Sequence, residues 1–373
     1  MRKIVLTIHL FLSLILGLFV VVTCTSGSLL MIESDVERLV HPIGQQPTPG
    51  DVGVKVIQQQ ADAMNPDLKS DRIEWPAQDG FYHIHLIKEG GKDAGLVYAD
   101  PGTGKVFGKV QKERREPFAT IYNLHRYFLL TDVIGKQQAA YFVGFLGIGL
   151  LLILVTGIYL WWPGIRKWAL GFRFIRNRGK LAYNMSLHKM VGIISIPVLL
   201  IITLTGVVNA YEKSIPVWFG FTAKETIPAS ALQSKSKDQP MLSIENVVNL
   251  VEKSYPESKL TKIQLPLKPG QSIQVGLKEG FGASSSNNST VYMDASTGDI
   301  LYKTNPNLAI NLYNTWRKGL HFATWGGETT KLIYFVFGMM PLILMFTGIM
   351  MWQLKARARR KNTKKKANEA IAA

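Results

Sequence analysis

The chain has 373 residues, 47% of them apolar, which is enough for a helical membrane bundle with one or two small domains outside it. Its net charge of +17 is concentrated in residues 1–3, 163–189 and 353–373, which hold 2, 7 and 8 Lys/Arg residues against one acid, Glu369. Positive charge confined to short segments beside apolar runs is typical of membrane orientation and excludes a nucleic-acid-binding surface as its cause.

Four apolar runs are each long enough to cross a bilayer, which takes about 20 residues: Ile4–Ile32, Ala139–Trp162, Met190–Ala210 and Leu332–Trp352. The first run is too long for an ordinary signal peptide, so we interpret it as a helix. The predicted order is helix 1 (4–32), periplasmic domain 1 with an interfacial segment (33–138), helix 2 (139–162), a cytoplasmic basic loop (163–189), helix 3 (190–210), periplasmic domain 2 with an interfacial segment (211–331), helix 4 (332–352) and a cytoplasmic basic tail (353–373). This describes a multi-pass protein of a bacterial inner membrane with both termini in the cytoplasm.

The two halves of the chain repeat one another. His9 and Gly27 are 18 residues apart, and so are His188 and Gly206. Matching segments of the outer domains are Val52–Met64 with Ile244–Ser254, Arg72–Pro76 with Lys262–Pro266, and Val97–Val106 with Val291–Ile300. The first pair has helical spacing, and the last pair surrounds an Asp-x-x-Thr-Gly turn that predicts a β-hairpin. The predicted fold is therefore an all-α four-helix membrane bundle with two small periplasmic α+β domains, formed by internal duplication.

The exit helices share the pairs Thr156-Gly157 and Thr347-Gly348. Small residues at this position are typical of close helix packing in membranes, and we interpret both pairs in that way.

Four histidines occupy matching places in the two halves. His9 and His188 lie at the cytoplasmic starts of helices 1 and 3, and His125 and His321 lie in the outer segments before helices 2 and 4. An ionisable group beside a membrane span is costly without a partner, so each is a candidate functional residue. Paired neutral imidazoles in a dry bundle suit axial ligation of haem iron, which predicts two bis-histidine haem sites, His9/His188 and His125/His321.

The two outer histidines lie well before their helices. A straight helix from His125 to Trp162 would be about 56 Å long, far more than one span. We therefore expect the chain to bend at Gly135 and at Gly326-Gly327. Amphipathic interfacial segments would then carry His125 and His321.

The carboxylates of a haem would need cations. The candidates are Arg2, Lys3 and Lys189 near the inner pair, and Arg126, Arg317 and Lys318 near the outer pair. Tetrahedral zinc is a poorer fit, because no thiolate or Glu-x-x-His spacing accompanies the histidines, and a proton relay would lack acids in the spans.

His83 and His85 point to one face of a predicted strand. They could contact a metal-bearing substrate, but their counterparts Ile273 and Val275 are apolar, so a plain strand surface is the favoured interpretation.

The motifs together resemble the PepSY-associated transmembrane family, especially its siderophore-iron reductase members. The segments that carry the resemblance are the two Asp-x-x-Thr-Gly hairpins, His188–Gly192, Leu204–Gly206, Leu320-His321 with Gly326-Gly327, and Thr347-Gly348 with Trp352. The resemblance implies two haem b groups held by His9, His188, His125 and His321. It also implies reduction of a periplasmic ferric siderophore from Fe(III) to Fe(II). Helix 1 departs from the pattern, because it has Thr-Ser-Gly in place of Thr-Gly.

The electron donor stays open. No dinucleotide-binding fingerprint is present, so electrons would come from a separate cytoplasmic reductase or from quinol. Two other functions remain as alternatives. One is a membrane-anchored PepSY binding or regulatory protein without redox activity, which has no use for His9 and His188. The other is a transporter, for which broken helices and intramembrane carboxylates are missing.

Overall fold

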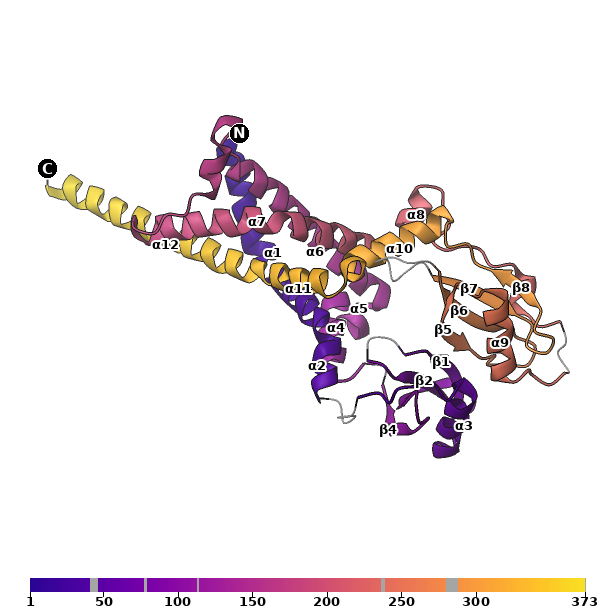
Figure 1. The fold of residues 1–373 in the computed structure, drawn as a ribbon. Coiled ribbons are helices and arrows are strands. Elements are labelled where there is room, and N and C mark those ends of the chain that lie inside the picture. Colours follow the sequence, from indigo (N-terminus) through magenta and orange to yellow (C-terminus); the bar gives the residue numbers. More distant parts are fainter. Residues whose placement is uncertain (41–45, 77–78, 113, 236–238, 280–287, 373) are drawn as a thin grey trace.

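The computed structural model describes residues 1–40, 46–76, 79–112, 114–235, 239–279 and 288–372 (Figure 1). Within them, four helical segments are long and apolar enough to cross a membrane. They are α1 (Arg2–Met31), α6 (Lys136–Trp161), α7 (Gly179–Ala210), and α11 (Gly327–Gly338) followed by α12 (Met340–Ala372). The four predicted spans are therefore present as helices.

Two of these helices extend beyond the bounds that hydropathy predicts. Helix α7 begins at Gly179 rather than Met190, so His188 lies inside it and not in a loop. Helix α12 continues through the basic segment to Ala372. Hydropathy detects only the apolar part of a helix, whereas backbone hydrogen bonding continues through Lys, Arg and Ala, which are good helix formers.

The bundle packs through small residues where helices approach most closely. A Cβ atom placed on Gly144 of α6 would lie 2.6 Å from the ring of Tyr211, and one on Gly147 would lie 2.7 Å from Val207. Glycine at these positions lets α6 and α7 meet without displacing side chains. Apolar side chains from α1, α6 and α7 fill the centre of the bundle: Val20, Leu150, Leu154 and Leu199.

The strands form one antiparallel sheet of eight in the order β4-β3-β2-β1-β5-β6-β7-β8. They are β1 (Lys69–Glu74), β2 (Tyr82–Lys88), β3 (Lys92–Ala99), β4 (Val106–Gln111), β5 (Lys259–Gln264), β6 (Ile273–Lys278), β7 (Asn288–Met293) and β8 (Ile300–Lys303). Helices α3 (Val54–Met64) and α9 (Ile244–Ser254) supply buried side chains to a single hydrophobic core that both halves of the sheet share.

The expectation of two separate small domains is corrected by the pairing of β1 with β5. These two strands pair antiparallel, with Ile73 opposite Ile263, the two positions that the sequence repeat matches. A four-stranded unit ending at β1 or β5 would expose an edge strand, and edge strands are favourable sites for pairing. Each half covers the open edge of the other, so the outer part is one continuous sheet.

The segments between sheet and bundle bend as the sequence predicts. Gly135 begins α6 with φ +83°, and Gly327 begins α11 with φ +63°. Phe128, Leu129 and Ala323 also have positive φ, which places further turns after α4 (Phe118–Tyr127) and α10 (Ala309–His321). Helices α4 and α10 therefore fold back onto α1 and α7.

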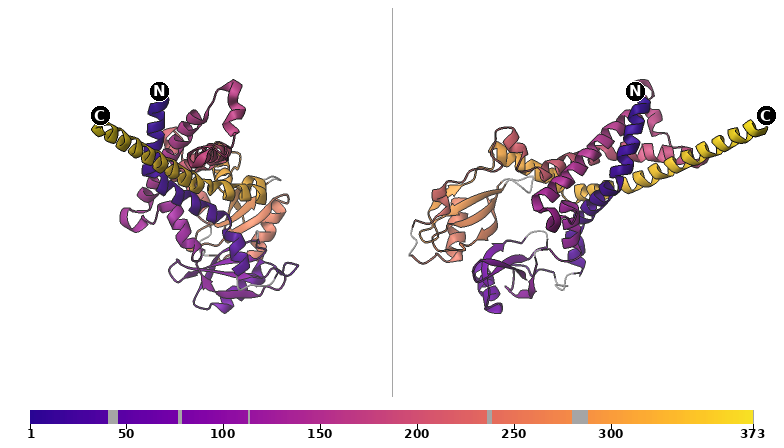
Figure 2. Two further views of the ribbon diagram at one scale, coloured as in Figure 1. Left: turned by 90° about the vertical axis from the view of Figure 1, so that its left-hand side faces the viewer. Right: turned by 180° about the vertical axis from the view of Figure 1, so that it is seen from behind.

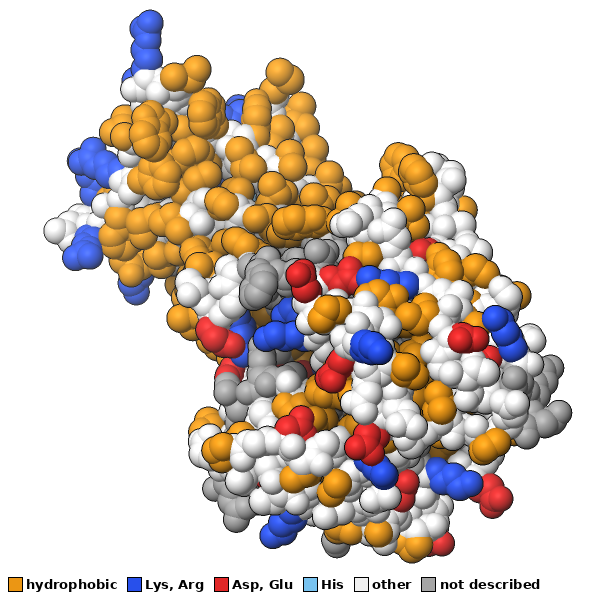
Figure 3. Space-filling model, turned by 45° about the vertical axis from the view of Figure 1, so that its right-hand side comes forward, with side chains coloured by type: hydrophobic (Ala, Val, Ile, Leu, Met, Phe, Trp, Pro, Cys, Tyr) orange, Lys and Arg blue, Asp and Glu red, His pale blue; other side chains and the backbone are white. Residues whose placement is uncertain are grey.

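Both termini lie at the end of the bundle that is remote from the sheet (Figure 2). In Figure 3 the bundle surface is almost entirely hydrophobic, and Lys and Arg side chains gather at that remote end. An apolar belt with cations at one end is the surface of a protein that is embedded in a membrane.

The aspartates of the two hairpin turns are buried acceptors. Asp294 is fully buried and accepts hydrogen bonds from Ser234 Oγ at 2.8 Å and from the backbone nitrogens of Lys235, Ser296 and Thr297 at 2.6, 2.9 and 3.1 Å. Burial alone would raise the pKa of Asp294, but these hydrogen bonds outweigh it and lower the pKa. The ionised carboxylate therefore joins the turn to the segment that precedes α9.

We expect Asp294→Asn to destabilise the sheet by about 2–4 kcal/mol, because an amide loses the charge and leaves a buried donor unpaired. The measurement is thermal unfolding of the purified protein, compared with Asp299→Asn, whose side chain is exposed. Because the folded-state pKa is lowered, the stabilisation is present at neutral pH and is lost as the pH falls below about 4 towards the folded-state value. Equal stability of the two variants would contradict this role.

Candidate functional site

The inner histidine pair joins α1 to α7. The ring centres of His9 and His188 are 6.5 Å apart, with the ring planes at 90°. His9 lies in the first third of α1, near the N-terminus, and His188 lies 179 residues further along the chain, in α7. The structure thus brings together the two residues that the sequence repeat matches.

The outer histidine pair joins α4 to α10, at the end of the bundle next to the sheet. The ring centres of His125 and His321 are 6.1 Å apart, with an angle of 26° between the planes. Burial lowers the pKa of both imidazoles. The neighbouring His125 and the positive charges of Arg126 and Arg317 lower the pKa of His321 further, to about 3. Both rings are therefore neutral, which is the form that binds metal.

Both separations suit two imidazoles on opposite sides of one metal ion. A metal–nitrogen bond of about 2 Å and a further distance of about 1.1 Å from each nitrogen to its ring centre give about 6 Å between ring centres. In the described part of the chain, no group of three or more His, Cys, Asp or Glu residues gathers as a metal site. Each pair would therefore offer two imidazole nitrogens to a metal ion whose remaining ligands come from another group.

Every ring of the two pairs packs against a glycine of another helix. Cβ atoms placed on Gly27, Gly157, Gly206 and Gly348 would lie 2.6, 3.5, 3.2 and 3.8 Å from the Cε1 atoms of His125, His9, His321 and His188. The glycine of each Thr-Gly or Ser-Gly pair is thus the surface on which an imidazole rests. At Gly27 a methyl group would clash with the imidazole ring of His125.

The threonines beside three of these glycines hold the Nδ1 atoms of three of the histidines. The Oγ1 atoms of Thr156, Thr347 and Thr205 lie 2.9, 2.9 and 3.1 Å from the Nδ1 atoms of His9, His188 and His321. Each threonine hydroxyl also donates to a carbonyl of its own helix, so its oxygen accepts from Nδ1–H. In α1, where Ser26 replaces threonine, the carbonyl of Thr23 accepts from His125 Nδ1 at 2.9 Å.

This arrangement leaves Nε2 of each ring unprotonated and free to bind metal. The Thr-Gly pairs thus lie at close helix contacts, as the packing interpretation predicts, and in addition they contact and orient the histidines. The spacing of 18 residues between histidine and glycine on one helix was the available signal. Eighteen residues correspond to about 27 Å of helix. The glycine therefore contacts a histidine of the other pair, at the opposite end of the bundle from the histidine on its own helix.

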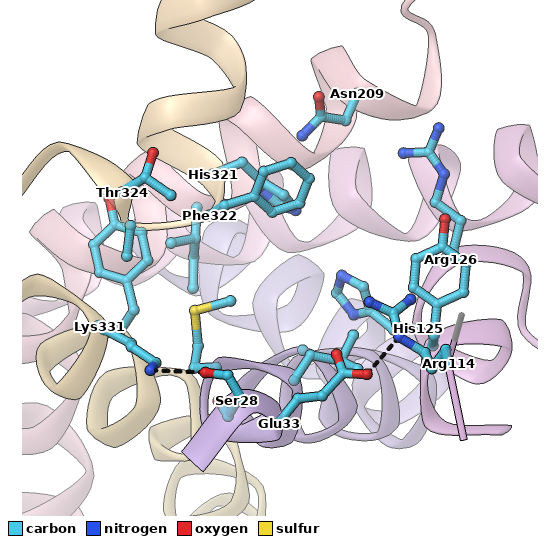
Figure 4. Close-up of a pocket in the computed structure, with 18 of the residues that line it drawn as sticks. Ser28, Glu33, Arg114, His125, Arg126, Asn209, His321, Phe322, Thr324 and Lys331 are labelled. Atoms are coloured by element: carbon cyan, nitrogen blue, oxygen red, sulfur yellow. Dashed lines mark hydrogen bonds and ion pairs between the residues drawn. The ribbon is translucent and has the colours of Figure 1, made fainter. Parts of the chain in front are cut away.

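The outer pair opens into a cavity of about 1470 Å³ between the bundle and the sheet (Figure 4). Its walls come from the bundle, from α2 (Glu33–Val40), from α4 and α10, and from the face of the sheet opposite α3 and α9. Acidic and basic side chains both line it, among them Glu33, Glu37, Asp79, Arg114, Arg126 and Lys331.

The predicted cations differ in where they lie. Arg126 lines the cavity and lies 3.4 Å from Glu212. Arg317 is buried and held by Glu212 and by the side chains of Asn209 and Asn314, so it joins α10 to α7 and is not part of the described cavity lining. Lys189 is exposed on α7.

Two cavity cations were missed by the sequence interpretation. Arg114 forms an ion pair with Glu33 at 2.5 Å and lies over the ring of Tyr122 at 4.2 Å. Lys331 lies 2.7 Å from Asp35. Neither belongs to a repeated motif, and their partners lie 81 and 296 residues away, so local sequence carried no signal for them.

The interpretation of His83 and His85 as a plain strand surface was wrong, because both line the cavity. His85 is 7% exposed and lies 2.8 Å from the guanidinium of Arg72, and burial together with that charge lowers its pKa to about 4. His83 lies 2.5 Å from Asp79.

The sequence interpretation aligned His83 and His85 with Ile273 and Val275, and this alignment of the two strands was wrong by one residue. Ile84 lies opposite Ile73, and Val275 lies opposite Ile263. Ile84 and Val275 are therefore equivalent, and the counterparts of the two histidines are Gln274 and Gly276. A shift of one residue moves every side chain of a strand to the other face.

The comparison with protein families agrees with this architecture. The family model described as PepSY-associated TM region matches residues 6–355, which covers nearly the whole chain. No curated protein matches the sequence. The chain therefore belongs to the PepSY-associated transmembrane family.

Proposed function

We propose that the protein is a di-haem b electron-transfer protein, an oxidoreductase that carries electrons across the membrane to a ferric siderophore. The observation that carries the proposal is the pair of histidine sites with ring centres 6.5 and 6.1 Å apart, at opposite ends of one bundle. Haem, when bound, supplies one-electron oxidation and reduction. Each histidine pair would hold one haem iron, and an iron held by two histidines favours electron transfer over oxygen binding.

The orientation follows from charge. Lys and Arg gather at the end of the bundle that carries the termini, so we place that end in the cytoplasm and the sheet in the periplasm of a bacterial inner membrane. The inner pair then receives electrons from a separate cytoplasmic reductase or from quinol, and the outer pair delivers them. The matched histidines and the pairing of Ile73 with Ile263 support an origin by internal duplication.

The side chains near the outer pair suit the carboxylates of a haem. The Nε atoms of Arg126 and Arg317 are buried and have no hydrogen-bond partner among the described residues. Such donors are costly unless something accepts from them, and a carboxylate is the acceptor that arginine prefers. Lys189 would serve the inner haem from the membrane edge.

The cavity suits an acceptor beside the outer haem. Pockets for one small ligand are typically about 300–1,000 Å³, and this cavity of about 1470 Å³ is larger. It has room for a macrocycle and for a ferric chelate under the sheet. Reduction to Fe(II) weakens the chelate, so the product leaves without a general acid or base.

We expect His188→Ala to lose about half of the haem and nearly all reduction of a ferric siderophore, because the inner iron would lose one of its two axial ligands. The measurements are pyridine-haemochrome quantitation and the rate of Fe(II) formation by the purified protein. His83→Gln is the matched control for haem content, since His83 belongs to neither pair. Undiminished reduction by His188→Ala would contradict an electron path through the inner pair. Absence of both haem and reduction in the unaltered protein would leave the non-redox binding role.

We expect Gly27→Ala to lower the haem content from two per chain towards one, because its Cβ would lie 2.6 Å from His125 Cε1. Gly17→Ala on the same helix is the control, since nothing lies within 4 Å of a Cβ there. The assay is the ratio of haem to protein after purification with excess haem. Full haem content in Gly27→Ala would show that this glycine does not position the outer ligand.

A further inference from the structure

Helix α2 places two carboxylates on the wall of the cavity. It continues from α1 beyond the membrane span, and Glu33 and Glu37 lie one turn apart on it. Both line the same cavity as His125 and His321. Figure 4 shows Glu33 and its partner Arg114 beside His125. Both carboxylates therefore share the cavity into which the outer histidine pair opens.

Glu37 differs from the other acids of the cavity. Glu33 pairs with Arg114, Glu74 with Arg72, Asp79 with His83, and Glu328 with Lys331. Glu37 is half-buried and has no ion pair or hydrogen bond among the described residues. It is the carboxylate of this wall whose charge is least compensated.

The groups around Glu37 come from each neighbouring element. They are Glu33 on α2, His83 on β2, Tyr98 on β3, and Arg114 and Arg115 after β4. Burial raises the pKa of Glu37, and the negative charge of Glu33 raises it further. The positive charges of Arg115 and Arg114 act in the opposite direction but do not cancel the rise. The side chain thus binds a proton more readily than an exposed glutamate does.

The inner pair has no comparable neighbour. Asp and Glu are absent from α1, α6 and α7, and from Lys331 to Trp352 in the last span. The polar contacts of His9 and His188 are threonine hydroxyls and a backbone carbonyl. A carboxylate can therefore respond to charge at the outer pair only.

We propose that Glu37 is a redox-linked proton-binding site of the outer histidine pair. This rests on the proposed function. If a haem iron held by His125 and His321 gained one electron from the inner pair, the Glu37 carboxylate would bind one proton from the surrounding water and become a carboxylic acid. When the electron passes to the ferric acceptor, the same proton returns to water. The net charge of the cavity would thereby be kept constant, and a change in charge costs free energy beside partly buried groups.

The test is a potentiometric titration of the full-length, haem-loaded protein, followed by haem absorbance at a series of pH values. Ionised Glu37 favours the oxidised state, so the midpoint potential of the outer haem should fall as the pH rises. Complete linkage changes the one-electron equilibrium tenfold for each pH unit, about 59 mV. The midpoint of the inner haem should be independent of pH. His188→Ala, which keeps the outer haem, identifies which midpoint belongs to it.

Glu37→Gln should remove the pH dependence of the outer midpoint while both haems remain bound, and Glu37→Asp should restore part of it. Glu328→Gln is the matched control, because Glu328 lines the same cavity but pairs with Lys331. Outer midpoints that do not vary with pH in the unaltered protein, or that vary equally in Glu37→Gln, would overturn the proposal and leave the electron path intact. A protein that binds no haem would remove the proposed function, and this proposal with it.

Discussion

The structure depends on four hydrogen bonds that hold imidazole Nδ1 atoms against neighbouring helices. A polar ring beside a membrane span is costly unless a partner accepts its proton, and each histidine finds that partner on a different helix. For His9 and His188 the partners are Thr156 and Thr347. At each of these contacts the imidazole ring lies against a glycine, which lets the two helices pack closely around it. Helix packing and ligand orientation are therefore satisfied by the same contacts.

These contacts connect the two ends of the bundle. Helix α1 carries His9 at one end and supplies Gly27 to the outer pair at the other, and α7 carries His188 and supplies Gly206 in the same way. A shift of either helix along its axis would disturb both pairs at once. The sheet adds a second link, because β1 and β5 join the halves of the chain above the outer pair. The two sites are thus held in fixed relation.

The surroundings of the two pairs differ, and the difference suits transfer in one direction. The inner pair lies among apolar side chains and hydroxyl groups, whereas the outer pair opens into a cavity with charged walls. For the electron transfer that we propose, a dry inner site would protect an electron in transit, and a charged cavity would admit a polar acceptor. Each half of the chain contributes one histidine to each pair, but only the outer pair faces the sheet.

The sequence by itself determined the spans, the four histidines, the hairpin aspartates and the bends at Gly135 and Gly327, because each depends on local periodicity, spacing or backbone conformation. Only the tertiary structure decided that the two outer units form one sheet, that His83 and His85 face the cavity, and that threonine and glycine pairs orient the histidines. These features depend on contacts between residues far apart in the chain and on a strand register in which one step exchanges the two faces. Local sequence patterns contain neither kind of information.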